Sequence, residues 1–212
     1  MQKKFSLILA NTSRSYQYFN QIRKTKLFVD KILYYSKKRS KLIQMVEKYK
    51  LKNKILNINS NNINSVSIKK ILKEWNSEYI LFSGYKGEII KSNFLSKKNI
   101  VHCHPGYLPR FKGSTTIYYS LLKNFTIDVT LIKIKKAIDS GNILFRKKFN
   151  VPKNLKLIEK YFDDYIRAET FVTFIKSSKN TSNKQKKNRG NGYYYIAHPV
   201  IRDMVINYSN YI

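Results

Sequence analysis

Short apolar segments alternate with amphipathic ones along the first hundred residues, and this alternation is the strongest constraint on the fold. Four apolar segments are expected to be buried strands: Phe5–Ala10, Phe28–Tyr35, Ile55–Ile58 and Tyr79–Phe82. Two segments between them carry apolar residues at helical spacing: Lys41–Tyr49, and Val66–Trp75 with Ser65 as its N-cap. Strands that alternate with helices favour an α/β, Rossmann-like fold in which helices flank a mostly parallel sheet.

The second half of the chain continues this pattern and then changes in composition. Further strands are expected at Asn99–Cys103, Val129–Ile138 and Ile143–Phe149, and helices at Ser114–Lys123 and Glu159–Ile175. A polar low-complexity stretch at about 176–192 predicts a loop, and the aromatic segment Tyr193–Ile206 is expected to dock back on the domain. We therefore predict a catalytic domain over residues 1–150 and a short C-terminal extension over residues 151–212.

The charge of the chain is strongly positive, with 42 Lys and Arg against 12 Asp and Glu and a formal net charge of +30. Clustered cations would indicate a nucleic-acid partner. Here the basic residues are mostly Lys and are spread along the chain, in a composition rich in Asn, Ile and Tyr that is typical of AT-rich genomes. We interpret the charge as a solvated surface that attracts anionic substrates, and we expect no nucleic-acid partner.

The cysteine count and the hydropathy pattern predict a cytoplasmic protein. Cys103 is the only cysteine, so the chain cannot form an internal disulfide, which suits a reducing compartment. The N-terminal apolar run is short and soon turns polar, and no segment approaches the roughly 20 apolar residues that a membrane span needs.

Two histidines and one aspartate are the candidates for chemistry. His102 and His104 lie two apart on a predicted strand, so they face one side while Cys103 faces the other. They could act as acid/base groups or metal ligands, or one could be a buried structural histidine. Asp139 stands in an Asp-Ser-Gly turn where it could orient or deprotonate a histidine, or only cap its own backbone. A metal site formed by the two histidines and Asp139 is the less favoured interpretation, and no metal is expected.

Taken in order, these residues resemble the formyltransferases that use N10-formyltetrahydrofolate. The matching motifs are His104-Pro105, Leu108-Pro109, Lys112-Gly113 and Asp139-Ser140-Gly141-Asn142-Ile143, in that order and spacing. The segment Phe82–Ile90 resembles the folate-side loop of the family. The resemblance covers about Lys4 to Phe149 and implies the formyltransferase fold.

The resemblance implies a one-carbon transferase in which an amine attacks the formyl carbon and an oxyanion develops. His104 would be the base or the oxyanion partner, and Asp139 would orient it and relay the proton through water. The chain has His102 where the family has Asn, whose amide donates a hydrogen bond to the formyl oxygen. A neutral imidazole can also donate one bond, but the substitution also allows a catalytically weakened relative.

The resemblance also implies two binding regions. The co-substrate N10-formyltetrahydrofolate would contact Phe82, Gly84, Tyr85, Gly87, Ile89 and Ile138. The acceptor would contact Pro105, Gly106, Lys112, Gly113, Ser114 and Thr115. Three cations could hold a diphosphate, although each also reads as surface charge: Arg110, Lys112 and Arg167.

Members of the family formylate methionyl-tRNA, glycinamide ribonucleotide or nucleotide-linked amino sugars. Few residues follow Phe149, so we expect no C-terminal barrel of the kind found in the tRNA enzymes. The hydroxyl- and tyrosine-rich segment Gly113–Tyr119 suits a sugar ring, although a helix start and core packing explain it equally well. We favour a nucleotide-linked amino sugar as the acceptor, with glycinamide ribonucleotide or methionyl-tRNA as alternatives, and leave a homodimer open. The alternative from another class is a basic RNA-binding protein.

Overall fold

The computed structural model describes residues 3–48, 55–91, 98–177 and 192–207. The chain forms two compact units, Met1–His102 and Cys103–Ile212. The boundary lies within one strand, β5 (Ile100–His104), which therefore has residues in both units. The division into a catalytic domain and an extension at residue 150 stays a prediction.

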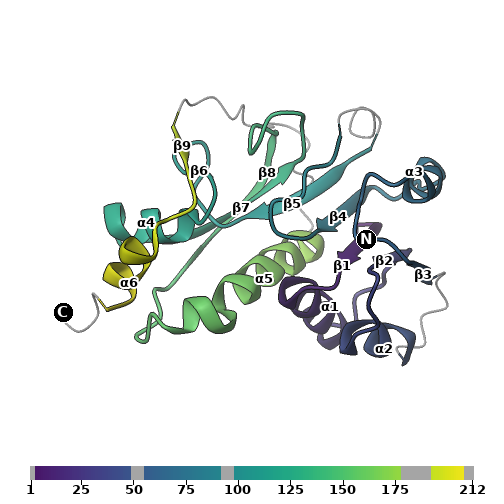
Figure 1. The fold of residues 1–212 in the computed structure, drawn as a ribbon, viewed down its shortest axis with the longest axis horizontal. Helices are drawn as coiled ribbons and strands as arrows, with labels where there is room; N and C mark the ends of the chain where they lie inside the picture. Colours follow the sequence, from purple (N-terminus) through teal and green to yellow (C-terminus); the bar gives the residue numbers. More distant parts are fainter. Residues whose placement is uncertain (1–2, 49–54, 92–97, 178–191, 208–212) are drawn as a thin grey trace. The chain divides into compact units, whose positions relative to one another are not determined.

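The first unit is a parallel sheet with helical connections (Figure 1). Its elements in chain order are β1 (Phe5–Ala10), α1 (Ser13–Lys24), β2 (Ile32–Tyr35), α2 (Lys41–Lys48), β3 (Ile55–Ile58), α3 (Val66–Lys73) and β4 (Tyr79–Ser83). The strand order is β3-β2-β1-β4-β5, and each neighbouring pair is parallel. The order reverses between β1 and β4, and such a switch point is where open α/β sheets bind ligands, beyond the carboxyl ends of the strands.

The second unit continues the sheet from β5 through β7 to β8. Its elements after β5 are β6 (Lys112–Gly113), α4 (Thr116–Asn124), β7 (Ile127–Lys133), β8 (Ile143–Phe149), a π-helical turn (Ile158–Phe162), α5 (Asp163–Lys176), β9 (Tyr193–Tyr194) and α6 (Pro199–Asn207). Strands β7 and β8 are antiparallel, and α5 packs along both (Figure 1). The seven-stranded sheet confirms the mostly parallel, Rossmann-like α/β fold.

Several predicted elements have the predicted bounds, including the strands Phe5–Ala10, Ile55–Ile58 and Ile143–Phe149. The predicted strand Phe28–Tyr35 was too long. The strand covers only Ile32–Tyr35, because the chain bends at Asp30, whose carboxylate accepts from the Ser77 hydroxyl. The Asp30 N–H still donates to the Phe5 carbonyl of β1 at 2.8 Å.

The predicted strand Val129–Ile138 was also misplaced, since β7 begins at Ile127 and ends at Lys133. At Lys133 the backbone N–H donates to the Asn142 carbonyl, which closes the connection to β8. A Cβ on Gly141 would lie 1.5 Å from the Lys133 carbonyl oxygen, so only glycine allows this close approach of the two backbones.

Helix α1 was not predicted from the sequence. Its buried face mixes the apolar Tyr18, Phe19 and Ile22 with Ser15 and Gln21, so the apolar periodicity is weak. The start signal is present, because Thr12 caps the helix and its side chain accepts from the Ser15 N–H at 3.1 Å.

Two predicted helix starts were also inaccurate in detail. Ser65 stands at the N-cap position of α3 but makes no capping hydrogen bond through its side chain. Helix α4 begins at Thr116, two residues later than predicted, because Thr115 is in the left-handed conformation with φ of 50°.

The segment after residue 191 contacts α4 and β6. Most of the predicted polar loop lies outside the described residues. Strand β9 pairs in parallel with β6, and the Tyr194 ring packs against the rings of Phe111 and Tyr119 at 5.5 and 4.6 Å. Among the described residues, no helix is both long and apolar enough to cross a membrane.

Candidate active site

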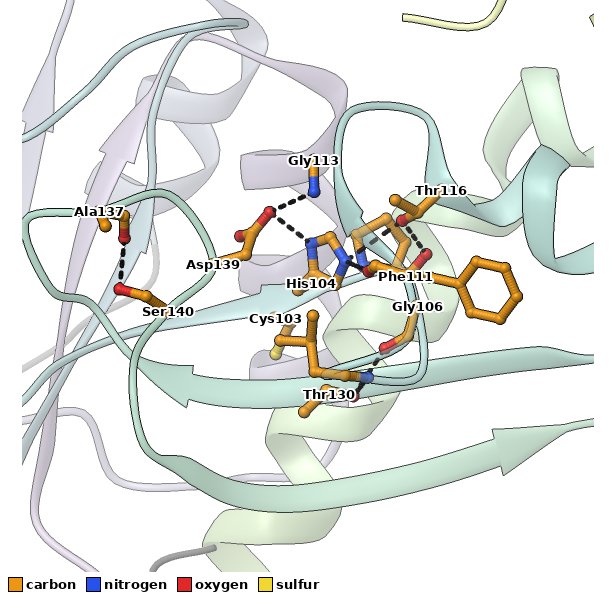
Figure 2. A network of polar contacts seen from close by, with 12 residues as sticks. Cys103, His104, Gly106, Phe111, Gly113, Thr116, Thr130, Ala137, Asp139 and Ser140 are labelled. Carbon is orange, nitrogen blue, oxygen red and sulfur yellow. Dashed lines mark hydrogen bonds and ion pairs between the residues drawn. The ribbon is translucent and has the colours of Figure 1, made fainter. Parts of the chain in front are cut away.

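His104 is the last residue of β5 and is almost fully buried, with 2% of its surface exposed. Its Nε2 lies 2.6 Å from the Phe111 carbonyl oxygen and 3.3 Å from the Thr116 hydroxyl oxygen. Its Nδ1 points the other way, toward the Asp139 carboxylate at 3.4 Å (Figure 2). Both ring nitrogens therefore have defined neighbours, and the imidazole has a single orientation.

Asp139 stands in the loop between β7 and β8 and has the left-handed backbone conformation, with φ of 48°. Asp and Asn adopt this conformation more readily than other residues with a side chain. Its Oδ2 accepts from the Gly113 N–H at 2.9 Å and faces His104 Nδ1 (Figure 2). The backbone N–H stabilises the charged form of the carboxylate, so Asp139 is suited to pair with a protonated imidazole.

The Pro-Gly loop that follows His104 is held by two strands of the second unit, β7 and β8. The buried Thr130 hydroxyl of β7 donates to the Gly106 carbonyl at 2.6 Å and accepts from the Leu108 N–H at 3.2 Å. The Arg146 guanidinium of β8 donates to the Leu108 carbonyl and lies 4.4 Å from the Tyr107 ring centroid. The loop is thus fixed on both sides of its most exposed residue, Tyr107.

The pair His102 and Cys103 follows the alternation expected of a strand. Cys103 is fully buried and its thiol forms no disulfide, whereas His102 is partly exposed. By the alternation of the strand, His102 lies on the same side of β5 as His104. The predicted role of His102 as the donor that replaces the family Asn stays a prediction.

The predicted folate-side loop follows β4, at the switch point of the first unit. Glu88 holds it in place, because its carboxylate accepts from the N–H groups of Ile63 and Tyr85 at 2.7 and 3.0 Å and from the Tyr35 hydroxyl. Burial, and after it the Glu88 carboxylate, raises the pKa of Tyr35 well above its usual range. Arg14 ties the loop to the start of α1 by donating to the Gly84 carbonyl at 2.7 Å.

The residues named for folate in this loop differ in their exposure. Phe82 is buried, and a Cβ on Gly84 would collide with its ring at 2.2 Å, whereas Ile89 is 56% exposed. Gly87 has a positive φ of 74°, which favours glycine. In the second unit, Ile138 is 54% exposed in the loop that carries Asp139.

The residues named for the acceptor are divided between two environments. Pro105 and Gly106 are buried in the loop after His104. The segment Lys112–Thr115 is hydrogen-bonded to the C-terminal segment, since Ser114 N–H donates to the Tyr194 carbonyl at 2.9 Å and Thr115 Oγ1 accepts from the Ala197 N–H at 2.7 Å. Lys112 is itself buried, with its ammonium 5.6 Å from the centroid of the Tyr193 ring. Their contact with an acceptor stays a prediction.

Of the cations considered for a diphosphate, Arg167 has a structural partner instead. It lies on α5, is nearly buried, and pairs with both oxygens of Asp163 at 3.0 and 2.8 Å. Its Nη1 also donates to the Cys103 carbonyl at 3.3 Å, next to His104 in the chain. Arg110 is exposed.

The sequence alone did not single out the hydroxyl and carbonyl groups around His104. Thr116, Thr130 and the Phe111 carbonyl lie 12, 26 and 7 residues after His104, and no motif joins them. A threonine in a strand or at a helix start has common structural explanations, so residue type carries no signal here. Only the fold brings the Phe111 carbonyl and Thr116 to the His104 imidazole, and Thr130 to the loop that follows it.

A comparison with known families matches most of the chain. A family model described as formyl transferase matches residues 3–163, about three quarters of the chain. The chain belongs to the formyl transferase family.

Curated relatives match a part of the chain. Methionyl-tRNA formyltransferase from Finegoldia magna is 29% identical over 105 residues, which are 48% of this chain and 34% of that protein. Methionyl-tRNA formyltransferase from Ehrlichia ruminantium is 33% identical over 93 residues, 40% of this chain and 30% of that protein. The chain spans about a third of the length of the curated relatives it matches.

A solved structure shares the fold at lower identity. The formyltransferase PseJ from Anoxybacillus kamchatkensis, in complex with a UDP-linked formamido sugar and tetrahydrofolate, has a TM-score of 0.52 at 19% identity over 78% of this chain and 85% of that one. At this identity the likeness supports the fold and leaves the acceptor undetermined.

Proposed function

We propose that this chain transfers a formyl group from N10-formyltetrahydrofolate to a primary amine. The observation that carries the proposal is the buried His104 with the Asp139 carboxylate 3.4 Å from its Nδ1, inside the range that matches the family. In the reaction the formyl carbon forms a bond to the amine nitrogen, its bond to N10 breaks, and one proton passes from the amine to N10. His104 and Asp139 hold or move that proton, and a protonated His104 also stabilises negative charge on the formyl oxygen.

Two loops have the properties that the co-substrate requires, each within its own unit. A reduced pterin is flat, with apolar faces and an edge of hydrogen-bonding groups. The loop after β4 lies at the switch point, is held by Glu88 and Arg14, and exposes Ile89. The loop after β7 exposes Ile138 beside Asp139. These residues fit the co-substrate, which supplies the activated formyl group when it is bound.

We further propose that the acceptor is a nucleotide-linked amino sugar in the cytoplasm. Tyr107 supports this assignment, since it is 40% exposed in the loop after His104 and could pack on a sugar ring or base. The Arg146 guanidinium beside it and the net charge of +30 favour an anionic acceptor such as a nucleoside diphosphate. PseJ, which shares the fold, was crystallised with a UDP-linked formamido sugar.

Methionyl-tRNA is the second candidate acceptor. The two curated relatives described above are methionyl-tRNA formyltransferases. In addition, a strongly basic chain gains affinity for a polyanion through counterion release. Transfer to tRNA would therefore weaken steeply with salt, whereas transfer to a sugar nucleotide would change little.

The experiment measures loss of the formyl group from N10-formyltetrahydrofolate by absorbance. The acceptors are a panel of UDP- and dTDP-linked amino sugars, glycinamide ribonucleotide and methionyl-tRNA, each at low and high salt. We expect turnover with one amino-sugar nucleotide, and its loss in His104→Ala. The matched control is His198→Ala, because His198 is exposed on the segment before α6. Turnover with none of the acceptors and no folate binding by calorimetry would refute the proposal and favour an RNA-binding protein.

A further inference from the structure

The two groups nearest to His104 Nε2 are both hydrogen-bond acceptors. The Phe111 carbonyl oxygen, at 2.6 Å, can only accept. The Thr116 hydroxyl lies 2.6 Å from the Pro105 carbonyl, which also can only accept, so the hydroxyl proton goes to Pro105. Thr116 therefore presents a lone pair to Nε2, 3.3 Å away.

An imidazole nitrogen that faces two acceptors must carry a proton. A bare Nε2 would place its lone pair against two oxygen lone pairs in a site that is 2% exposed, without water to relieve the repulsion. The neutral ring therefore has its proton on Nε2 and its lone pair on Nδ1. We propose that Phe111 and Thr116 hold His104 in this one tautomer, with Thr116 as a positioning residue, so that His104 gains and loses protons only at Nδ1.

The opposite edge of the ring also faces an oxygen acceptor, but at 3.4 Å rather than 2.6 Å, so a lone pair on Nδ1 is opposed less than a lone pair on Nε2 would be. Nδ1 faces Asp139 Oδ2 at 3.4 Å, and that oxygen already accepts from the Gly113 N–H. A neutral His104 would set its Nδ1 lone pair against the carboxylate, whereas a proton between the two atoms joins them. The proton that moves during catalysis is thus exchanged at the edge shared by His104 and Asp139. This consequence rests on the proposed formyl transfer, whereas the tautomer does not.

A second buried hydroxyl on the same helix serves as the control for the proposed effect of Thr116 on His104. Ser120 of α4 is also buried and also donates to a backbone carbonyl, that of Thr126 at 2.8 Å, but it has no described hydrogen bond with His104. Removing either hydroxyl costs one hydrogen bond donated to a backbone carbonyl. Only the loss of the Thr116 hydroxyl also removes an acceptor from Nε2.

The first test is nitrogen-15 NMR of protein labelled at histidine, with the His104 signals assigned by their absence in His104→Ala. We expect Nε2 to carry a proton in the folded protein, and the neutral ring to have its lone pair on Nδ1. A neutral His104 with its proton on Nδ1 would overturn the proposal. This result does not depend on any activity, so it separates the tautomer from the proposed formyl transfer.

The second test compares Thr116→Val, Thr116→Ser and Ser120→Ala. In Thr116→Val we expect faster exchange of the Nε2 proton with water and a kcat lower by about tenfold, the cost of one neutral hydrogen bond, with the KM for N10-formyltetrahydrofolate unchanged. Thr116→Ser should restore both readouts, and Ser120→Ala should change neither. Equal effects of Thr116→Val and Ser120→Ala on the Nε2 signal would show a merely structural role and overturn the assignment of Thr116.

Discussion

Replacing Asp139 by Asn tests the core of the proposed chemistry with little disturbance of the backbone. Asn tolerates the left-handed conformation that residue 139 adopts, and its side-chain oxygen can still accept from the Gly113 N–H. The change removes the negative charge 3.4 Å from His104 Nδ1. We therefore expect the free energy of unfolding to change by no more than about 1 kcal/mol.

The expected loss of activity follows from this distance. Two unit charges 3.4 Å apart attract by about 5 kcal/mol at an effective dielectric constant of about 20, which sets an upper limit to the effect. Proton transfer by a positioned side chain contributes about 10²–10⁴ in rate, or about 3–5 kcal/mol. Both values predict that kcat falls by about 10²–10⁴ in Asp139→Asn.

The assay is single-turnover formyl transfer, with thermal unfolding measured on the same preparations. The matched control is Asp128→Asn on β7, a half-buried carboxylate whose pKa burial raises and which has no described contact with His104. This control should keep its transfer rate. A folded Asp139→Asn protein that retains more than about a tenth of the rate would refute the role of the carboxylate in proton transfer.

Three further changes test how the structure supports the site. Gly141→Ala should destabilise the protein by roughly 3 kcal/mol or more, because the added Cβ would lie 1.5 Å from the Lys133 carbonyl oxygen. Denaturant unfolding measures this loss, and an unchanged midpoint would show that the two backbones can separate. Thr130→Val leaves the Gly106 carbonyl without its donor and should cost about 1–3 kcal/mol and lower kcat, whereas Thr130→Ser should retain both values; equal loss in the two variants would show that the hydroxyl is not the cause. Burial, and after it the carboxylate of Glu159, raises the pKa of Tyr118 from 10.0 to about 12 in the folded chain. The contribution of the Tyr118 hydroxyl to stability is therefore complete below pH 10 and is lost as the pH rises from 10 to 12. Tyr118→Phe should flatten the fall in stability over that range in a pH series of thermal unfolding, and an equally steep fall would contradict this assignment.

The spacing of apolar residues and the position of turn residues in the sequence were enough to predict the fold class and most of the helices and strands. Strands of the first unit that are buried on both faces read as continuous apolar runs, and β1 is buried at all six positions. The same cue overextended β2, because Phe28 and Val29 are apolar but precede the bend at Asp30. It missed α1, whose buried face includes Ser15 and Gln21, because hydrogen bonds rather than apolar contacts satisfy polar residues there.

The sequence by itself determined which residues could carry the chemistry, because ordered motifs at fixed spacing need no knowledge of the fold. His104 and Asp139 were predicted in this way, and the matching motifs between them include Lys112-Gly113. The tertiary structure decided which atoms of these residues meet: Nδ1 with Asp139, and Nε2 with Phe111 and Thr116. Hydrogen bonds act over about 3 Å and depend on direction, and these partners are separated by 7 to 35 residues of chain, so only folding creates the arrangement.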